Sequence, residues 1–145
     1  MTAAPGAIDV RARRGFGAWA KIVRRRARAV LVELGFGGAE LSVALVGEAE
    51  MTELNARWRG LERPTDVLSF SALDGEPVPA PGLVLGDVVV CVPVAEAQAR
   101  RAGHGTEREI ETLLVHGILH LVGYDHERSR ADARRMFALQ RRLLG

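Results

Sequence analysis

The pattern of apolar and polar residues predicts strands mixed with helices up to residue 93 and helices alone beyond it. Residues 7–13 show the period of two that is typical of a half-buried strand. Apolar positions recur with a helical period between residues 16 and 34, and Gly35 is suited to end that helix. Further strands are predicted at residues 41–46, 66–70 and 84–92, and further helices at residues 48–59, 94–101, 106–122 and 129–144.

Residues near the ends of the later helices match known capping patterns. Thr106 with Glu109 predicts a capping box at the start of one helix, and Ser129 with Asp132 predicts the start of the last one. Gly123 is placed to end the helix predicted at residues 106–122. Because the strand–helix–strand order comes first and the helices come last, we expect an α+β fold with a small mixed β-sheet covered by helices.

The chain length of 145 residues is that of one globular domain, so we expect residues 1–145 to form a single domain. Cys91 is the only cysteine, which excludes a disulfide framework and fits a reducing compartment. No apolar run approaches the roughly 18 residues of a membrane span, and the N-terminus lacks the apolar region of a signal peptide. We therefore expect a cytoplasmic protein with no membrane association.

Charge is distributed unevenly, although the whole chain carries a formal net charge of only +2. Residues 1–28 hold eight basic residues and one acidic residue, whereas residues 29–99 hold three basic and eleven acidic residues. Such segregation predicts a basic face that attracts polyanions such as RNA. A basic stripe on the first helix would suit a phosphate backbone, although a solvated helix face is the simpler interpretation; it consists of Lys21, Arg24, Arg25 and Arg28.

Three of the four histidines lie within eleven residues. His116 and His120 are four residues apart on a predicted helix, so their imidazoles share one face and can bind one ion. His126 can join them if the chain reverses at Gly123, which is free to adopt a positive φ. Two histidines at this spacing also occur by chance, but the third one beyond a helix-ending glycine favours a zincin-like metal-binding helix. His104 lies between two glycines and is interpreted as a solvated loop residue.

The donor set favours one catalytic Zn²⁺ ion over a structural one. Three neutral imidazoles leave a fourth position open for water and can lower the pKa of that water to about 7. A closed structural zinc site has four protein ligands that include cysteine, and Cys91 has no thiol partner. Gly117 stands where metzincin proteases place their glutamate base, so a peptidase would lack its base. The absence of a side chain at Gly117 either allows the helix to pack closely against a neighbour or leaves room beside the metal ion.

Three blocks of sequence carry a family resemblance: LNARWRGLERPTDVLSF at residues 54–70, LGDVVV at residues 85–90 and HGILHLVGYDH at residues 116–126. They resemble the bacterial YbeY endoribonucleases, the ribosomal RNA maturation factors. The resemblance implies a metal-dependent hydrolase specific for single-stranded RNA. It also implies late ribosomal RNA processing at the 3′ end of small-subunit rRNA, ribosome quality control, and the ribosome or ribosomal proteins as partners. Residues 1–39 and those beyond Glu127 match only in general character.

The resemblance also implies which residues form the site. His116, His120 and His126 correspond to the zinc ligands of the family, and Arg59 corresponds to an arginine tied to activity. We therefore expect His116 and Arg59 to be catalytic: metal-bound water would attack the phosphodiester while Arg59 stabilises charge on the phosphate. Without the family match, a surface salt bridge between Arg59 and Glu62 explains the arginine equally well.

The sequence leaves the general base unassigned. Asp125 and Glu127 lie nearest to the third histidine, although Asp125 could orient an imidazole instead, and Asp66 after Thr65 could be a turn residue. Tyr124 is the best placed of the few aromatic residues for stacking on bases. Two other functions remain as alternatives: a metallohydrolase of peptides or small esters, and a non-catalytic ribosome assembly factor with a structural metal.

Overall fold

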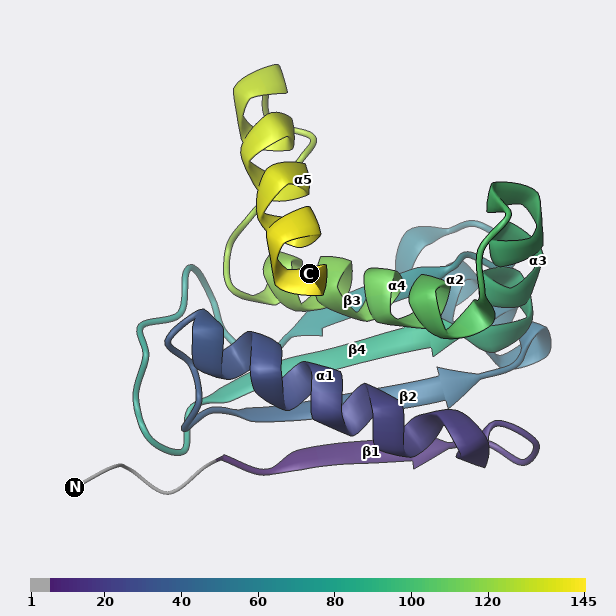
Figure 1. Cartoon of the computed structure of the whole chain (residues 1–145), viewed down its shortest axis with the longest axis horizontal. Helices are drawn as coiled ribbons and strands as arrows, with labels where there is room; N and C mark the ends of the chain where they lie inside the picture. The colour runs from purple at the N-terminus through teal and green to yellow at the C-terminus, as the bar shows by residue number, and fades with distance from the viewer. Residues whose placement is uncertain (1–5) are drawn as a thin grey trace.

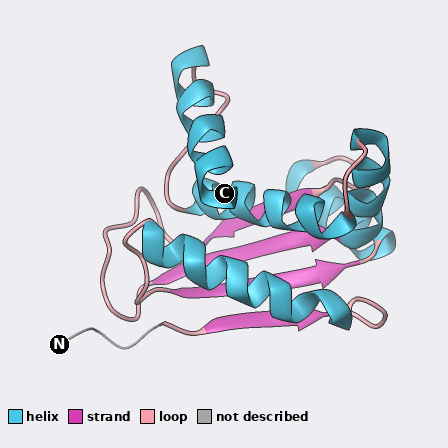
Figure 2. Cartoon of the chain, viewed as in Figure 1, coloured by secondary structure: helices cyan, strands magenta, loops and turns pink. Residues whose placement is uncertain are grey.

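The folded chain is a four-stranded mixed sheet with helices on both faces (Figure 1). The computed structural model describes residues 6–145, so the first five residues of the expected domain lie outside the described range. The predicted α+β class is confirmed, with a small mixed sheet in one domain (Figure 2). In chain order the elements are β1 (Ile8–Ala12), the 3₁₀ turn η1 (Gly17–Trp19), α1 (Ala20–Glu33), β2 (Glu40–Val46), α2 (Glu48–Arg59), β3 (Val67–Ser71), β4 (Val84–Cys91), α3 (Val92–Ala102), α4 (Thr106–Leu121) and α5 (Arg130–Leu144).

The strands are ordered β1-β2-β4-β3 across the sheet. β1 runs parallel to β2 because helix α1 returns the chain to the same end of the sheet. β2 also runs parallel to β4, because β3 runs in the opposite direction and carries the chain back between them. β3 runs antiparallel to β4 and forms one edge of the sheet. This edge matters for function, since the residues of β3 line a large open cleft.

Helices α1 and α4 cover one face of the sheet and build the main core with it (Figure 1). The apolar stripe predicted on the first helix is buried here, and α4 contributes the largest set of fully buried side chains. Burying one large aliphatic side chain contributes about 1.5–3 kcal/mol, so this layer fixes the position of α4 on the sheet. The side chains involved include Val23, Ala27, Val30, Ile110, Leu114 and Ile118.

Helix α2 packs on the opposite face of the sheet. Met51 and Leu54 of this helix form a second apolar cluster with Val89 and Cys91 of β4. Burial raises the pKa of the Cys91 thiol, as expected for an unreactive cysteine inside an apolar strand. The cluster holds α2 in place, and with it Arg59, the last residue of the helix.

At the ends of the helices one local prediction is wrong and another is incomplete. Gly105, not Thr106, is the N-cap of α4, and no side chain caps this helix, so the predicted capping box does not form. His104 is exposed as expected, but its Nε2 atom also lies 2.6 Å from the carboxylate of Glu109. Ser129 caps α5 as predicted, because its hydroxyl accepts a hydrogen bond from the backbone N–H three residues later.

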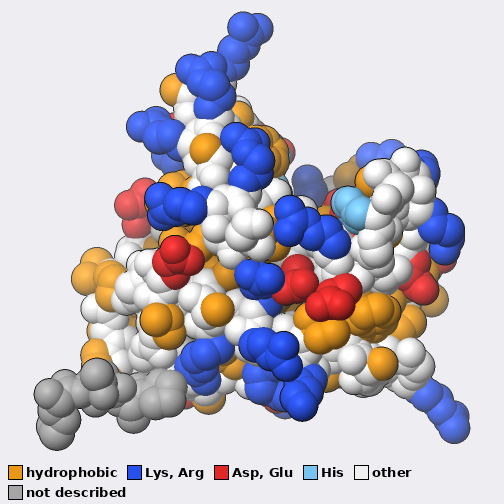
Figure 3. Space-filling model, in the orientation of Figure 1, with side chains coloured by type: hydrophobic (Ala, Val, Ile, Leu, Met, Phe, Trp, Pro, Cys, Tyr) orange, Lys and Arg blue, Asp and Glu red, His pale blue; other side chains and the backbone are white. Residues whose placement is uncertain are grey.

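The four basic side chains of the stripe on α1 have different surroundings: three are exposed, and one forms a hydrogen bond within the chain. Lys21, Arg24 and Arg25 are exposed, and Figure 3 shows basic side chains gathered over α1 and α5. Arg28 instead donates a 2.6 Å hydrogen bond to the carbonyl oxygen of Gly6 and so holds the segment before β1. Three of the four cations therefore remain available to a partner.

Gly117 allows α4 to approach the sheet closely. A Cβ atom at this position would lie 2.7 Å from Cγ1 of Val88 and 3.0 Å from Oγ of Ser69. The hydroxyl of Ser69 donates a 2.9 Å hydrogen bond to the carbonyl oxygen of Gly117 itself. Of the two interpretations left open by the sequence, the structure supports close packing, because a side chain here would point into the sheet.

Replacing Gly117 with alanine is expected to lower the free energy of unfolding by about 1–3 kcal/mol, because the added methyl group overpacks the interface between α4 and β4. This loss opposes a gain of about 1 kcal/mol in helix propensity. Urea unfolding measures the difference. Gly17→Ala is the control, since a Cβ atom there has no neighbour within 4 Å. A Gly117→Ala variant as stable as the parent would show that the close contact is not limiting.

Candidate metal centre

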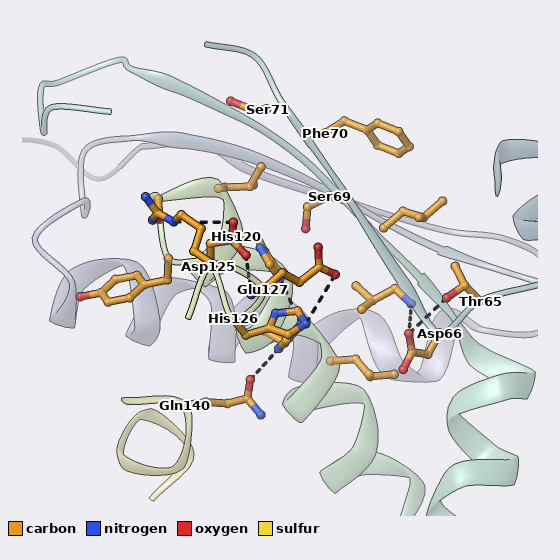
Figure 4. A pocket seen from close by; sticks show the side chains of 18 of the residues that line it. Thr65, Asp66, Ser69, Phe70, Ser71, His120, Asp125, His126, Glu127 and Gln140 are labelled. Atoms are coloured by element: carbon orange, nitrogen blue, oxygen red, sulfur yellow. Dashed lines mark hydrogen bonds and ion pairs between the residues drawn. The ribbon is translucent and has the colours of Figure 1, made fainter. Parts of the chain in front are cut away.

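Three imidazoles converge at the C-terminal end of α4. His116 and His120 project from successive turns, and their Nε2 atoms lie 3.2 Å apart. His126 comes from the loop after α4, and its ring centroid is 5.2 Å from each of the other two. One nitrogen of each residue lies within 4.8 Å of the others, so the three could hold one metal ion. Figure 4 shows His120 and His126 together in the cleft, with Gln140 of α5 beside them.

The predicted chain reversal at Gly123 is confirmed and brings the third imidazole back to the helix. Gly123 has a φ of 106°, a conformation that residues with a side chain rarely adopt. The backbone N–H of Gly123 donates to the carbonyl oxygen of His120, and that of Tyr124 donates to the carbonyl oxygen of Leu119, so two carbonyls of the last turn of α4 are satisfied. The turn is thus part of the site, because it sets the direction from which His126 enters.

Residues of α5 complete the surroundings of the histidines. Nδ1 of His116 lies 3.0 Å from Oε1 of Gln140, so Nδ1 carries the donated proton and the lone pair is left on Nε2. Phe137 stacks on the ring of His116 at 6.0 Å between centroids and also contacts the ring of His126. Together these contacts fix the His116 ring with Nε2 facing the other histidines.

Burial lowers the pKa of both His116 and His120 below the usual value of an imidazole. For His116 the hydrogen bond with Gln140 acts in the opposite direction without offsetting burial. For His120 the neighbouring His116 and His126 lower the pKa further. Both rings are therefore neutral near pH 7, and a neutral imidazole offers the lone pair that a metal ion needs.

The geometry of the three residues fits a tetrahedral metal ion. Two nitrogen ligands with bonds of about 2.0–2.1 Å to zinc stand about 3.3 Å apart, close to the 3.2 Å between Nε2 of His116 and Nε2 of His120. Nδ1 of His126 is buried and has no hydrogen-bond partner among residues 6–145. Buried polar atoms without a partner are rare, so a metal ion held by the three histidines would give this nitrogen the partner that it lacks.

The histidines lie in an open cleft of about 1090 Å³, bounded by β3, α4, α5 and residues 123–128. Arg59, at the end of α2, lines the same cleft and is exposed. It forms no hydrogen bond or ion pair with any described residue, so the alternative salt bridge with Glu62 does not form. Asp66 accepts hydrogen bonds from the backbone of the next residue and from Gln98, which makes it a turn residue at the start of β3.

Asn55 holds the loop that follows Arg59. Its Nδ2 atom donates a 2.8 Å hydrogen bond to the carbonyl oxygen of Arg63, and its backbone carbonyl oxygen accepts from the N–H of Leu61. The Asn55 side chain is 1% exposed, so this polar contact is protected from water. The buried Asn55 side chain therefore fixes the turn between α2 and β3, which follows directly after Arg59.

The two acidic residues beside the third histidine have different surroundings. Oδ1 of Asp125 accepts a hydrogen bond from the backbone N–H of Glu127, and Oδ2 lies 3.7 Å from Nε of Arg128. Asp125 therefore braces the loop, and it forms no hydrogen bond with an imidazole in the described structure. Glu127 is exposed, with Oε1 at 3.9 Å from Nε2 of His126.

Comparison with known proteins gives the family. The family model described as "Endoribonuclease YbeY" matches residues 12–145. The chain belongs to the YbeY family. A relative from Thermobifida fusca, named endoribonuclease YbeY, is 47% identical over 143 residues, which cover 94% of this chain and 91% of that protein. Another YbeY, from Acidothermus cellulolyticus, is 55% identical over 114 residues, covering 73% and 69%. A solution structure from Thermotoga maritima matches with a TM-score of 0.69 and 33% identity, covering 94% and 86%.

The resemblance to YbeY read from the sequence is thus confirmed, and the structure brings Arg59 and the three histidines to one cleft. Sequence reasoning missed Gln140 and Asn55 as supporting residues. Gln140 lies in the last helix, where only the amphipathic spacing was informative, and its partner is 24 residues away in sequence. Asn55 stood within the quoted family block, so its polar side chain at a buried helix position was the available signal.

Replacing Gln140 with alanine is expected to weaken zinc binding by about 10–100-fold, because the His116 ring loses the partner that fixes its tautomer and orientation. Competition with a chromogenic chelator measures the affinity. Gln98→Ala is the matched control, since this glutamine binds Asp66 and none of the histidines. Equal zinc affinity of the Gln140→Ala variant and the parent would contradict the supporting role of Gln140.

Proposed function

We propose that the chain is a zinc-dependent endoribonuclease that cuts single-stranded RNA in late ribosomal RNA processing, at the 3′ end of small-subunit rRNA, and in ribosome quality control. The observation that carries the proposal is the convergence of three imidazoles in a cleft that Arg59 also lines. Family membership supports the reaction class, since the relatives are named endoribonucleases. The roles of the individual residues are inferred from their positions in the cleft.

His116, His120 and His126 would hold one Zn²⁺ ion, with His116 contributing to catalysis as a ligand. When bound, the ion supplies a Lewis acid that activates water toward the phosphodiester. Arg59 supplies the second contribution, because its planar guanidinium can donate two hydrogen bonds to phosphate oxygens as negative charge builds up. Its lack of an ion-pair partner among residues 6–145 keeps this group free for the substrate.

The two rival functions are less well supported. A peptidase of the metzincin type needs a glutamate at position 117, but Cβ of any residue there would point at Val88 and Ser69 instead of the histidines. A purely structural metal site needs a fourth protein ligand, and the candidate ligand group within the described residues contains only the three histidines. The first consideration argues against a peptidase, and the second favours a metal site that leaves one position for substrate or water.

The expected partners follow from the substrate. Single-stranded ribosomal RNA and the ribosome, including ribosomal proteins, are the proposed partners, and the exposed cations Lys21, Arg24 and Arg25 would add salt-dependent attraction to RNA. A cytoplasmic location is proposed because ribosomes assemble in that compartment. No helix within residues 6–145 is both long enough and apolar enough to span a membrane.

Replacing Arg59 with alanine is expected to lower the rate of RNA cleavage by about 10²–10³-fold, because a positioned donor to the developing phosphate charge is removed. The assay compares kcat on a single-stranded oligoribonucleotide with added zinc. Circular dichroism and zinc content should match those of the parent, since the Arg59 side chain forms no hydrogen bond or ion pair within residues 6–145.

Arg57→Ala is the matched control for this variant, because Arg57 is also exposed near the end of α2 but does not line the cleft. Full cleavage by the Arg59→Ala variant would refute the role of Arg59. Cleavage that persists in a metal-free His116→Ala preparation would indicate a contaminating nuclease, so this preparation is run beside every assay.

A further inference from the structure

Aromatic side chains gather at the cleft. The chain has seven aromatic residues, counting two tryptophans, one tyrosine and four phenylalanines. Four of them line the cleft that holds the histidines, and three of these four are among the exposed large apolar side chains. The four are Trp58, Phe70, Tyr124 and Phe137.

Trp58 is the most exposed of these rings, at 63% of its surface. It precedes Arg59 at the end of α2, so the indole and the guanidinium enter the cleft from the same turn of helix. Its ring contacts Phe70 of β3 at 5.8 Å between centroids and an angle of 62°, an edge contact that supports one side of the indole. Because the ring is held by Phe70 but mostly open to water, it can still receive a flat partner.

Tyr124 enters the cleft from the histidine loop and is 37% exposed. Its backbone is fixed by the turn at Gly123 and by the hydrogen bond from its N–H to Leu119. Figure 4 shows Asp125, the next residue, and Phe70, the support of Trp58, on different sides of the histidines. The two exposed rings therefore approach the histidines from separate segments of the chain.

Phe137 differs from these two rings because it already has aromatic partners. It stacks on His116 with an angle of 22° between the rings and also lies against His126. We therefore assign Phe137 to support of the histidines. Trp58 and Tyr124 remain as the open aromatic surfaces of the cleft.

The charges in the cleft limit how strongly it can bind phosphates. Four acidic residues line it, against only two basic ones. Of the two, Arg128 is paired with Asp125 and Asp132, which leaves Arg59 as the unpaired cation among the described lining residues. A polyanion in this cleft needs a further source of affinity, and stacking on bases supplies about 1–3 kcal/mol per base without regard to charge.

We propose that Trp58 and Tyr124 stack on unpaired bases of an RNA strand whose phosphate lies between Arg59 and the histidines, and that they give the site its preference for single strands. The inference rests on the proposed function. Stacking on a side chain requires a free base face, and in a duplex both faces are covered by neighbouring bases. Paired RNA would therefore lose this part of the binding energy, whereas a single strand with splayed bases would gain it.

The experiment uses the zinc-loaded full chain with Trp19→Phe, so that Trp58 is the only tryptophan. Two hydrolysis-resistant phosphorothioate oligoribonucleotides are compared, one with all bases and one with an abasic ribose–phosphate backbone of equal length. We expect the first to quench Trp58 fluorescence and to bind at least about tenfold more tightly than the second, a difference of about 1.4 kcal/mol. Trp58→Ala and Tyr124→Ala, measured by anisotropy of labelled oligonucleotides, should each reduce this ratio.

Further variants separate stacking from other effects. Trp58→Phe should keep most of the preference for bases, because a smaller ring still stacks. Val32→Ala is the control for loss of an exposed apolar side chain, since Val32 is 59% exposed on α1 and does not line the cleft. Cleavage of single-stranded over double-stranded RNA should become less selective in Trp58→Ala, and circular dichroism checks its fold.

Failure of this inference differs from failure of the proposed function. If the parent binds and cleaves RNA but Trp58→Ala and Tyr124→Ala keep the full preference for base-bearing over abasic strands, the stacking role is overturned. A Trp58→Ala variant that loses affinity for both oligonucleotides equally also overturns it, because the lost contact would then not involve bases. If the parent neither binds nor cleaves any RNA, the proposed function itself fails.

Discussion

The close contact between α4 and the sheet is the constraint on which the metal centre depends. Gly117 brings the backbone of α4 against Val88 and Ser69, and the hydroxyl of Ser69 binds the Gly117 carbonyl oxygen at 2.9 Å. His116 is the next residue back along the same helix, so its imidazole leaves α4 beside the free edge of the sheet and not over the core. The helix can carry two polar ligands only because its opposite face is buried against the sheet.

The site is assembled from four separate segments of the chain. Helix α4 supplies two imidazoles one turn apart, and the turn at Gly123 supplies the third from a loop. Helix α5, which stands out from the sheet in Figure 1, adds Gln140 and Phe137 to the same cluster. A polar partner and an aromatic wall from a separate helix orient the ligands, which is how protein sites fix the geometry of a metal ion. The free cation Arg59 and the exposed indole of Trp58 reach the cleft from a fourth segment.

Local pattern in the sequence was enough for the helices and strands and for the grouping of the three histidines. The spacing of His116, Gly123 and His126 specified a helix and a reversal within eleven residues, and both are set by backbone geometry of short range. The start of α4 shows the limit of such reasoning. A capping box between Thr106 and Glu109 was predicted there, but the Glu109 carboxylate contacts the His104 side chain instead. Pairs distant in sequence could not be found from pattern, since no local rule links Gln140 to a residue 24 positions earlier.

The convergence of three imidazoles on one ion is tested most directly by X-ray absorption at the zinc edge of the zinc-loaded chain. We expect one zinc per chain with three histidine nitrogens at about 2.0–2.1 Å and one oxygen from a non-protein ligand. A spectrum with sulfur, with fewer than three imidazoles or with a fourth protein ligand that closes the site would contradict a catalytic metal centre at His116, His120 and His126.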